Sequence, residues 1–273
     1  MDRNLKIGIV GLGLIGGSIF KALCALKCNV FGVSKSSSTV EKAKKYTKNV
    51  SKSLVSLKGC DIVFVCTPIN KTIDILDRLD KIVSPNTIVT DVCSLKGFLA
   101  NKKYSYNFIP SHPMAGTEFI GFDSAFESLF QGAKWILTPI KKTDTEELKN
   151  LIDIIHVLGA SIIFTTPKEH DEAVALISHL LMVVSQGIFK TAKENDLALK
   201  MAASGFRDMT RLSLSNEEMV QDIINLNSNN IQNALLKLYS SIGTLLNKDT
   251  YKNQISEIKR EREMMYIEGK NIL

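Results

Sequence analysis

Residues 6–16 read KIGIVGLGLIG, a short apolar run that leads into glycines spaced as G-x-G-x-x-G at Gly11, Gly13 and Gly16. The apolar run predicts a buried strand, and the glycines predict a tight turn into a helix. In such a turn the first glycine permits the bend, the second lets a pyrophosphate approach the backbone, and the third allows close helix–strand packing. The free N–H groups of the helix start favour phosphate. We therefore expect a dinucleotide to bind at Gly11, Leu12, Gly13, Leu14, Ile15 and Gly16.

The residues around the motif also decide whether it could be a mononucleotide P-loop or a glycine-rich turn without a ligand. A mononucleotide P-loop needs a lysine directly after its last glycine, whereas Gly16 is followed by Gly17 and Ser18, so this type of site is excluded. A glycine-rich turn without any ligand is compatible with the motif taken alone. The position directly after a strand, at the start of an α/β pattern, favours the dinucleotide.

The rest of the first half alternates strand-like apolar runs with helical stretches. Further strands are expected at 29–33, 61–66, 87–92, 107–110, 134–137 and 161–165, and helices such as 146–158 lie between them. This alternation predicts a doubly wound, mostly parallel sheet of Rossmann type, with helices on both faces and right-handed crossovers. We expect this dinucleotide-binding domain to span residues 1–165.

Residues 166–273 contain no convincing strand and predict an all-helical domain. Between Ala173 and Ile188, apolar residues occupy nearly every face of the expected helix. Such a helix must be covered on all sides, which a helical domain of about 100 residues cannot do alone. We therefore expect a homodimer through the helical domain.

Composition excludes several classes of protein. The 273 residues are 45% apolar, as in globular proteins, and carry 34 basic and 28 acidic side chains spread along the chain, so no nucleic-acid partner is expected. Five cysteines without a C-x-x-C pair, and histidines without ligand spacing, indicate neither a disulfide framework nor a metal site. We find no leader peptide and no run of about 18 uncharged apolar residues, so a cytoplasmic protein without a membrane partner is expected.

The residues at the ends of the second and third expected strands indicate which dinucleotide is favoured and which side chains face it. An NAD site places an acidic residue after the second strand, but Ser34, Lys35 and Ser36 stand there instead. Hydroxyls and a lysine suit the 2′-phosphate of NADP, which is favoured over NAD, although NAD use stays open. A polar loop with a helix cap is the alternative for these residues. Cys66, Thr67 and Pro68 end the third strand and are expected to face the cofactor.

Two polar residues follow the next strands, Ser94 and His112. The carboxyl ends of parallel strands meet at one edge of a sheet, so these side chains are expected to converge. A neutral histidine suits removal of a proton from an alcohol as hydride leaves, although a structural histidine is the alternative. His156 and His170 are expected at the surface.

The helical half has two polar insertions, one at Ser178 and His179 and one at residues 204–211 (SGFRDMTR). An arginine of the second insertion either pairs with the neighbouring aspartate or grips a substrate carboxylate with two hydrogen bonds.

Together the motifs resemble the prephenate and arogenate dehydrogenases of tyrosine biosynthesis, most of all the NADP-using arogenate enzymes of cyanobacterial type. The resemblance rests on GLGLIGGS (11–18), TDVCSLK (90–96), SHPMAGT (111–117), ISHL (177–180) and SGFRDMTR (204–211). It implies oxidative decarboxylation of a small cyclohexadiene, with hydride passing to the cofactor while His112 takes the hydroxyl proton. It further implies that Ser94 orients the hydroxyl and His112, that Arg211 holds a carboxylate, and that Thr117, Ser178 and His179 contact the substrate.

The chain departs from some relatives at two positions. A second histidine of some prephenate-using relatives is Met182 here, and a tryptophan of some relatives is Val220. Both changes remove polar groups near the substrate side chain, which favours arogenate and leaves prephenate open.

Two rival functions stay open. A β-hydroxyacid dehydrogenase carries a catalytic lysine and a following asparagine pair on its interdomain helix, whereas Lys190 and Lys193 are followed only by Asn195. A non-catalytic NADP-sensing protein has no need of Ser94, His112 and Arg211 together.

Overall fold

The computed structural model describes residues 4–117, 119–139, 146–247 and 250–268. The chain divides into two compact units, with the boundary between His170 and Asp171. The boundary expected from sequence, after residue 165, falls five residues earlier, at the start of a helix whose first residues pack with the first unit.

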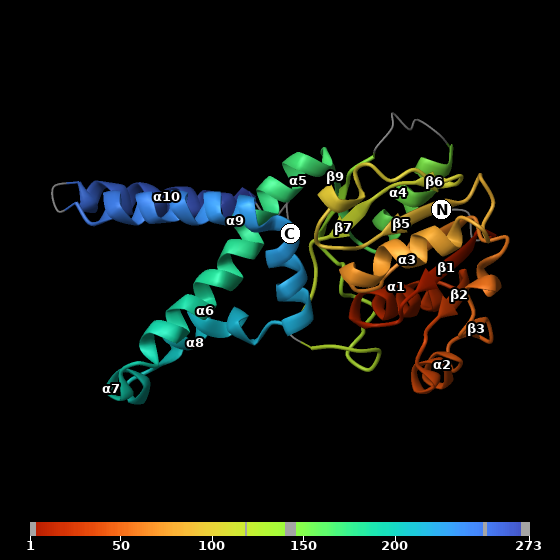
Figure 1. Cartoon of the computed structure of the whole chain (residues 1–273), viewed down its shortest axis with the longest axis horizontal. Coiled ribbons are helices and arrows are strands. Elements are labelled where there is room, and N and C mark those ends of the chain that lie inside the picture. The colour runs from red at the N-terminus through yellow and green to blue at the C-terminus, as the bar shows by residue number, and fades with distance from the viewer. Residues whose placement is uncertain (1–3, 118, 140–145, 248–249, 269–273) are drawn as a thin grey trace. The chain divides into compact units, whose positions relative to one another are not determined.

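The first unit is built on a six-stranded parallel sheet in the order β3-β2-β1-β4-β5-β6 (Figure 1). The strand order reverses between β1 and β4, as in dinucleotide-binding folds, where ligands bind beyond the carboxyl ends at the reversal. The expected doubly wound sheet is confirmed, with some strands shorter than expected. The strands are β1 (Lys6–Val10), β2 (Asn29–Val33), β3 (Val50–Ser51), β4 (Ile62–Val65), β5 (Ile88–Asp91) and β6 (Asn107–Phe108).

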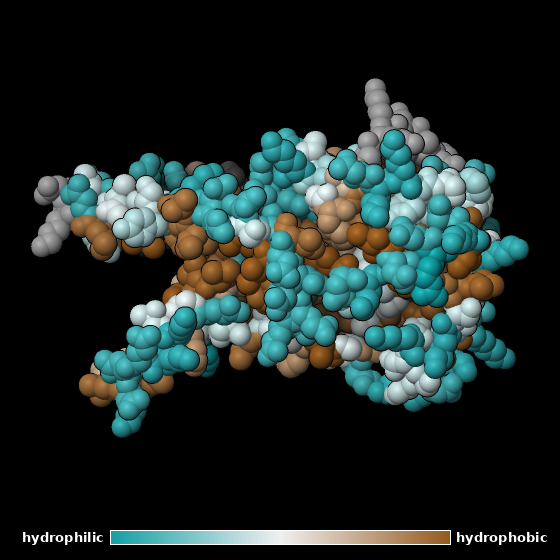
Figure 2. All heavy atoms as spheres, viewed as in Figure 1, coloured by the Kyte–Doolittle hydropathy of each residue, from teal (hydrophilic) through white to brown (hydrophobic). Residues whose placement is uncertain are grey.

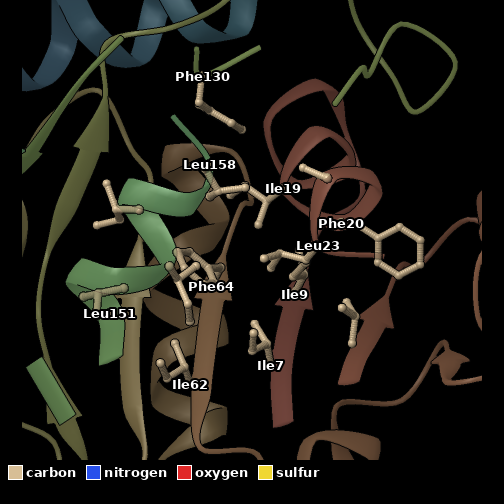
Figure 3. Packing of buried hydrophobic residues seen from close by; sticks show 14 of the residues in the cluster. Ile7, Ile9, Ile19, Phe20, Leu23, Ile62, Phe64, Phe130, Leu151 and Leu158 are labelled. Carbon is tan, nitrogen blue, oxygen red and sulfur yellow. The ribbon is translucent and has the colours of Figure 1, made fainter. Parts of the chain in front are cut away.

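Helices cover both faces of this sheet because alternate strand residues point to opposite sides. Ile7 and Ile9 of β1 and Phe64 of β4 pack with Ile19 and other residues of α1 on one face (Figure 3). Val10, Val63 and Val65 enter a second cluster with residues of α3 on the other face. The helices of this unit are α1 (Leu14–Ala25), α2 (Ser37–Ala43), α3 (Ile69–Leu79) and α4 (Glu146–Val157), with short 3-10 turns at Leu54–Leu57 and Gly97–Leu99.

A second, three-stranded sheet corrects one expectation. The run at 107–110 contributes β6 to the main sheet as expected, but the runs at 134–137 and 161–165 do not join it. Instead β7 (Ser111–Pro113), β8 (Lys134–Leu137) and β9 (Ser161–Phe164) form a separate sheet, with β7 antiparallel to β8. The reason lies at Ser111. Its N–H bonds to the Asp91 carboxylate at 3.2 Å, and its hydroxyl donates to the Asp91 carbonyl at 2.7 Å, so regular pairing with β5 ends there. His112 therefore lies within a strand.

The second unit contains only helices among its described residues, which confirms the all-helical expectation. Asn195 and Asn216 start α7 and α9 by accepting hydrogen bonds from the N–H groups of Ala198 and Met219. The helical elements are α5 (Pro167–Val174), a π-helical turn (Ala175–His179), α6 (Leu180–Ala192), α7 (Asp196–Lys200), α8 (Ser204–Thr210), a 3-10 turn (Arg211–Leu214), α9 (Glu217–Leu245) and α10 (Tyr251–Glu268).

The helical run through α5 and α6 is not covered on all sides by its own chain. Leu176, Ile177 and Leu181 are 44%, 62% and 45% exposed, and Figure 2 shows apolar side chains at the surface of the helical unit. Contrary to the sequence-based expectation, residues 167–192 are long and apolar enough to cross a membrane by length and composition, with 28% of the apolar window buried. A helix that packs against a partner subunit meets the same criteria.

Candidate functional site

The glycine motif forms a tight turn between β1 and α1. Gly11 has a φ of +89°, and a Cβ there would lie 2.4 Å from the carbonyl oxygen of Cys66. A Cβ at Gly16 would lie 2.0 Å from the Gly11 oxygen, whereas a Cβ at Gly13 would meet nothing within 4 Å. Open space therefore lies over Gly13, where α1 begins without a side-chain cap. These features fit a dinucleotide pyrophosphate.

Residues 66–68 shape this turn from the end of β4. The Cys66 side chain packs against Gly16, and burial raises the pKa of its thiol. The hydroxyls of Thr67 and Thr72 lie 3.0 Å apart, and Pro68 directly precedes α3. The carbonyl group of Cys66 therefore borders the glycine turn at Gly11, and its side chain borders it at Gly16.

The segment after β2 combines a helix cap with basic side chains. The Ser36 hydroxyl accepts from the N–H of Thr39 at 3.2 Å and caps α2, while the Ser36 N–H donates to the Ser34 hydroxyl at 3.3 Å. Lys35 is exposed. Lys52, which follows β3, donates to the Ser37 hydroxyl at 3.1 Å. Two lysines thus flank a serine-rich turn, and Lys52 is a residue that was not expected here.

A fully buried ion pair anchors the ends of β5 and β7. The Lys96 ammonium contacts the Asp91 carboxylate and donates to the Ser111 carbonyl at 2.6 Å. The same carboxylate accepts from the N–H of Cys93 at 2.9 Å. Each charge therefore has hydrogen-bond partners besides the other, which a buried pair requires.

This anchor holds the residues that directly precede two of the expected catalytic residues. Ser94 directly follows Cys93 and is half-buried, and His112 directly follows Ser111 and is 9% exposed. Both neighbours bond to the Asp91 carboxylate. One carboxylate thus holds the main chain next to Ser94 and next to His112, and the convergence of these two side chains stays a prediction.

His170 is the residue that the sequence interpretation missed. It was expected at the surface, but it is 2% exposed and its Nε2 lies 3.0 Å from Nδ1 of His112. It lies four residues before the buried Val174, so both residues are on the inner face of α5. This spacing of four residues was the signal in the sequence that could have predicted the burial of His170. His156, by contrast, is exposed as expected.

The remaining expected substrate residue of the first unit is Thr117. It is exposed in the loop after β7, and its hydroxyl accepts from the N–H of Phe119 at 3.2 Å. Lys21 of α1 holds the following part of this loop by donating to the carbonyl oxygens of Phe122 and Ala125 at 3.1 and 2.6 Å.

The helical unit holds the other expected substrate residues. His179 is 1% exposed and its Nδ1 lies 3.1 Å from the side-chain amide of Asn227, while Ser178 is half-buried. Arg211 is exposed at the start of a 3-10 turn that packs on α6. The Arg207–Asp208 ion pair is 3.5 Å long and largely exposed, so it contributes little.

A pocket of about 690 Å³ lies within this unit. Its lining combines Phe189 of α6, Leu214 of the turn that begins at Arg211, and Val220 with Glu217 of α9. Val220, one of the two departures from relatives, is therefore a pocket residue.

Two family profiles match the chain. One is described as the nucleotide-binding domain of prephenate dehydrogenase and matches residues 21–164, and the other is its dimerization domain and matches residues 166–261. The prephenate dehydrogenase of Bacillus subtilis is 31% identical over 241 residues, which cover 82% of this chain and 64% of that protein. The chain thus matches less than two thirds of the length of that relative.

Solved structures agree with these matches. Arogenate dehydrogenase of Synechocystis has 34% identity and a TM-score of 0.79, covering 98% of this chain and 100% of that one. Prephenate dehydrogenase of A. aeolicus, in complex with hydroxyphenyl propionate and NAD+, has 28% identity and a TM-score of 0.84, covering 96% and 98%. With both domain profiles matched in order along the sequence, the chain belongs to the prephenate dehydrogenase family.

Proposed function

We propose that this protein oxidatively decarboxylates arogenate or prephenate, with hydride transfer to a nicotinamide dinucleotide. The observation that carries the proposal is His112, which is buried beside the anchored end of β5 and bonded through Nδ1 to His170. The family match supplies the substrate class.

His112 is the proposed proton acceptor. If neutral His112 carries its proton on Nδ1 and donates it to His170, the Nε2 lone pair can take the substrate hydroxyl proton. When bound, a nicotinamide would supply the acceptor for the hydride of the ring carbon, which leaves a carbonyl at that carbon. Loss of the ring carboxylate as CO2 then makes the ring aromatic, because the electron pair of the broken bond moves through the ring to the carbonyl oxygen, which takes back the proton held by His112. A positioned base of this kind contributes about 10²–10⁴-fold to the rate.

The other residues bind and orient. Ser94 orients the hydroxyl towards His112, and the main chain of residues 11–16 holds the pyrophosphate. Arg211, Thr117, Ser178 and His179 hold the substrate, and Arg211 suits a carboxylate because its guanidinium can donate two parallel hydrogen bonds. The apolar Met182 and Val220 favour arogenate over prephenate.

NADP is the proposed cofactor, in preference to NAD. The support is the absence of an acidic residue after β2, together with Lys35 in the turn and Lys52 at the Ser37 hydroxyl. We expect Lys52→Ala to weaken NADP binding by roughly tenfold, as for one lost hydrogen bond to a charged group, and to leave NAD binding unchanged. Lys58→Ala, at another exposed lysine six residues further along the chain, is the matched control. Equal losses for both dinucleotides would contradict this assignment.

A cytoplasmic homodimer is also proposed. Its support is the exposed apolar surface of the helical unit and the dimerization-domain profile that matches it. Light scattering should give about twice the chain mass of 30.2 kDa without detergent. A monomeric mass, or a need for detergent, would contradict the dimer.

The activity is tested by initial rates with arogenate or prephenate as substrate and NADP or NAD as acceptor. Turnover with arogenate and NADP is expected to be fastest, and His112→Asn should abolish turnover while NADPH still binds. Turnover of β-hydroxyacids in place of these substrates would support the rival enzyme class. Binding of NADPH without turnover of any substrate would support a sensor.

A further inference from the structure

Two irregular helical segments meet inside the helical unit. The π-helical turn Ala175–His179 interrupts the run between α5 and α6 and ends at His179. Helix α9 is kinked at Asn227, whose φ and ψ of −127° and 19° are not helical. Both side chains are buried, at 1% and 4% exposure. Such π-helical turns are frequent at functional sites.

The Asn227 side chain is fully engaged by three groups. Its Nδ2 donates to the carbonyl oxygen of Asp171 at 2.9 Å and lies 3.1 Å from Nδ1 of His179. Its Oδ1 accepts from Nδ2 of Asn230 at 2.9 Å. These contacts tie the kink of α9 to both ends of the segment that contains the π-helical turn.

The orientation of the Asn227 amide follows from its backbone partner. A carbonyl oxygen can only accept, so the atom facing Asp171 must be the amide nitrogen rather than the oxygen. That nitrogen has a second hydrogen, which is directed at His179. Nδ1 of His179 must therefore be an acceptor without a proton, and the proton of the neutral ring is on Nε2.

We infer that Asn227 is a positioning residue that holds His179 in the tautomer with Nε2–H, so that His179 donates to an oxygen of the substrate. This inference rests on the proposed function and adds to it the chemical class of the group that His179 recognises. That group is a carboxylate or carbonyl oxygen and not the ammonium of an amino-acid side chain, because Nε2–H cannot accept a hydrogen bond. Asn227 itself does not contact the reacting atoms.

The tautomer can be measured directly in the intact protein. Long-range ¹H–¹⁵N correlation spectra of protein labelled at its 4 histidines distinguish Nε2–H from Nδ1–H, and His179→Gln identifies the His179 signals. At neutral pH we expect the Nε2–H pattern for His179. A wild-type signal with the proton on Nδ1, or on both nitrogens, would overturn the inference without any variant.

In Asn227→Asp the group beside Nδ1 of His179 is a carboxylate, which can accept a hydrogen bond but cannot donate one. His179 is then expected to move its proton to Nδ1, whereas Asn230→Ala, which leaves the Asn227 amide in place, should keep it on Nε2. Far-UV circular dichroism and the melting temperature check that both variants fold. An unchanged His179 signal in folded Asn227→Asp would also overturn the inference.

Steady-state kinetics distinguish a role of Asn227 in positioning His179 from a general loss of structure. In Asn227→Asp, the KM for the substrate should rise by about tenfold, as for one lost hydrogen bond to a charged group, while kcat changes less than about twofold. A fall in kcat at unchanged KM would contradict a binding role for His179. If the wild type turns over neither arogenate nor prephenate, the proposed function fails, and the spectra still decide the tautomer.

Discussion

Nε2 of His170 lies 3.0 Å from Nδ1 of His112, and both rings are almost fully buried. One of these nitrogens must carry the hydrogen and the other must accept it. If His112 is the donor, its Nε2 keeps a lone pair for a substrate proton, and His170 stabilises the cation that forms. His170 then has the role that a carboxylate has in the Ser-His-Asp arrangement, without a negative charge.

The pair predicts different outcomes for two His170 variants. His170→Leu should lower kcat by roughly 10²-fold, because it removes the acceptor for His112, whereas His170→Asn should retain more activity, because its side-chain oxygen can accept. NADPH affinity should stay unchanged in both. The measurement is kcat with NADP and the preferred substrate, and His156→Leu, at an exposed histidine, is the control. Equal losses in the Leu and Asn variants would show that His170 acts only by filling space.

The buried Asp91–Lys96 pair predicts a large loss of stability when one partner is removed. Lys96→Met leaves the Asp91 carboxylate buried without its cation, which should cost about 3–5 kcal/mol of unfolding free energy. Arg78→Met breaks the exposed Asp74–Arg78 pair and should cost less than about 1 kcal/mol. Urea unfolding compares the two. Similar values for both variants would argue against a stabilising anchor beneath Ser94 and His112.

Substitutions at two glycines of the motif should have different effects, one on stability and the other on dinucleotide binding. Gly16→Ala places a Cβ 2.0 Å from the Gly11 oxygen and should lower the free energy of unfolding by roughly 1–3 kcal/mol. Gly13→Ala meets nothing within 4 Å, so it should keep its melting temperature and weaken dinucleotide binding by roughly tenfold or more. Thermal unfolding and NADPH titration separate these effects. Normal NADPH affinity in Gly13→Ala would place the pyrophosphate elsewhere.

The Cys93 thiol should react slowly with iodoacetamide. Burial, together with the nearby Asp91 carboxylate, raises its pKa from 9.0 to about 12. At pH 8 roughly 10⁻⁴ of the thiol is then thiolate, against about one tenth at a pKa of 9.0, and only the thiolate reacts. The rate should rise with pH. Peptide mapping after timed alkylation measures it, with protein unfolded in urea as the fast control, and equal rates in both states would refute the shift.

Local pattern accounts for most of the fold and for part of the site. The spacing of Gly11, Gly13 and Gly16 and the apolar strands predict the parallel sheet, because these features depend only on neighbours in the chain. Ser94 and His112 could be expected together, since parallel strands end at one edge. The spacing of His170 and Val174 indicates only that His170 is buried, and its contact with His112 could not be predicted because it joins positions 58 residues apart. The second sheet was missed for a similar reason, since it depends on the bond between Ser111 and Asp91.

By itself, the sequence determined the dinucleotide turn, the order of strands and helices and the separation into an α/β half and a helical half, because periodicity and glycine spacing act over a few residues. Only the tertiary structure decided which polar side chains meet. The contacts of His112 with His170, Asp91 with Lys96 and His179 with Asn227 are all buried. A buried polar group must find a partner, and that partner is determined by how distant segments pack rather than by its own neighbours in the chain.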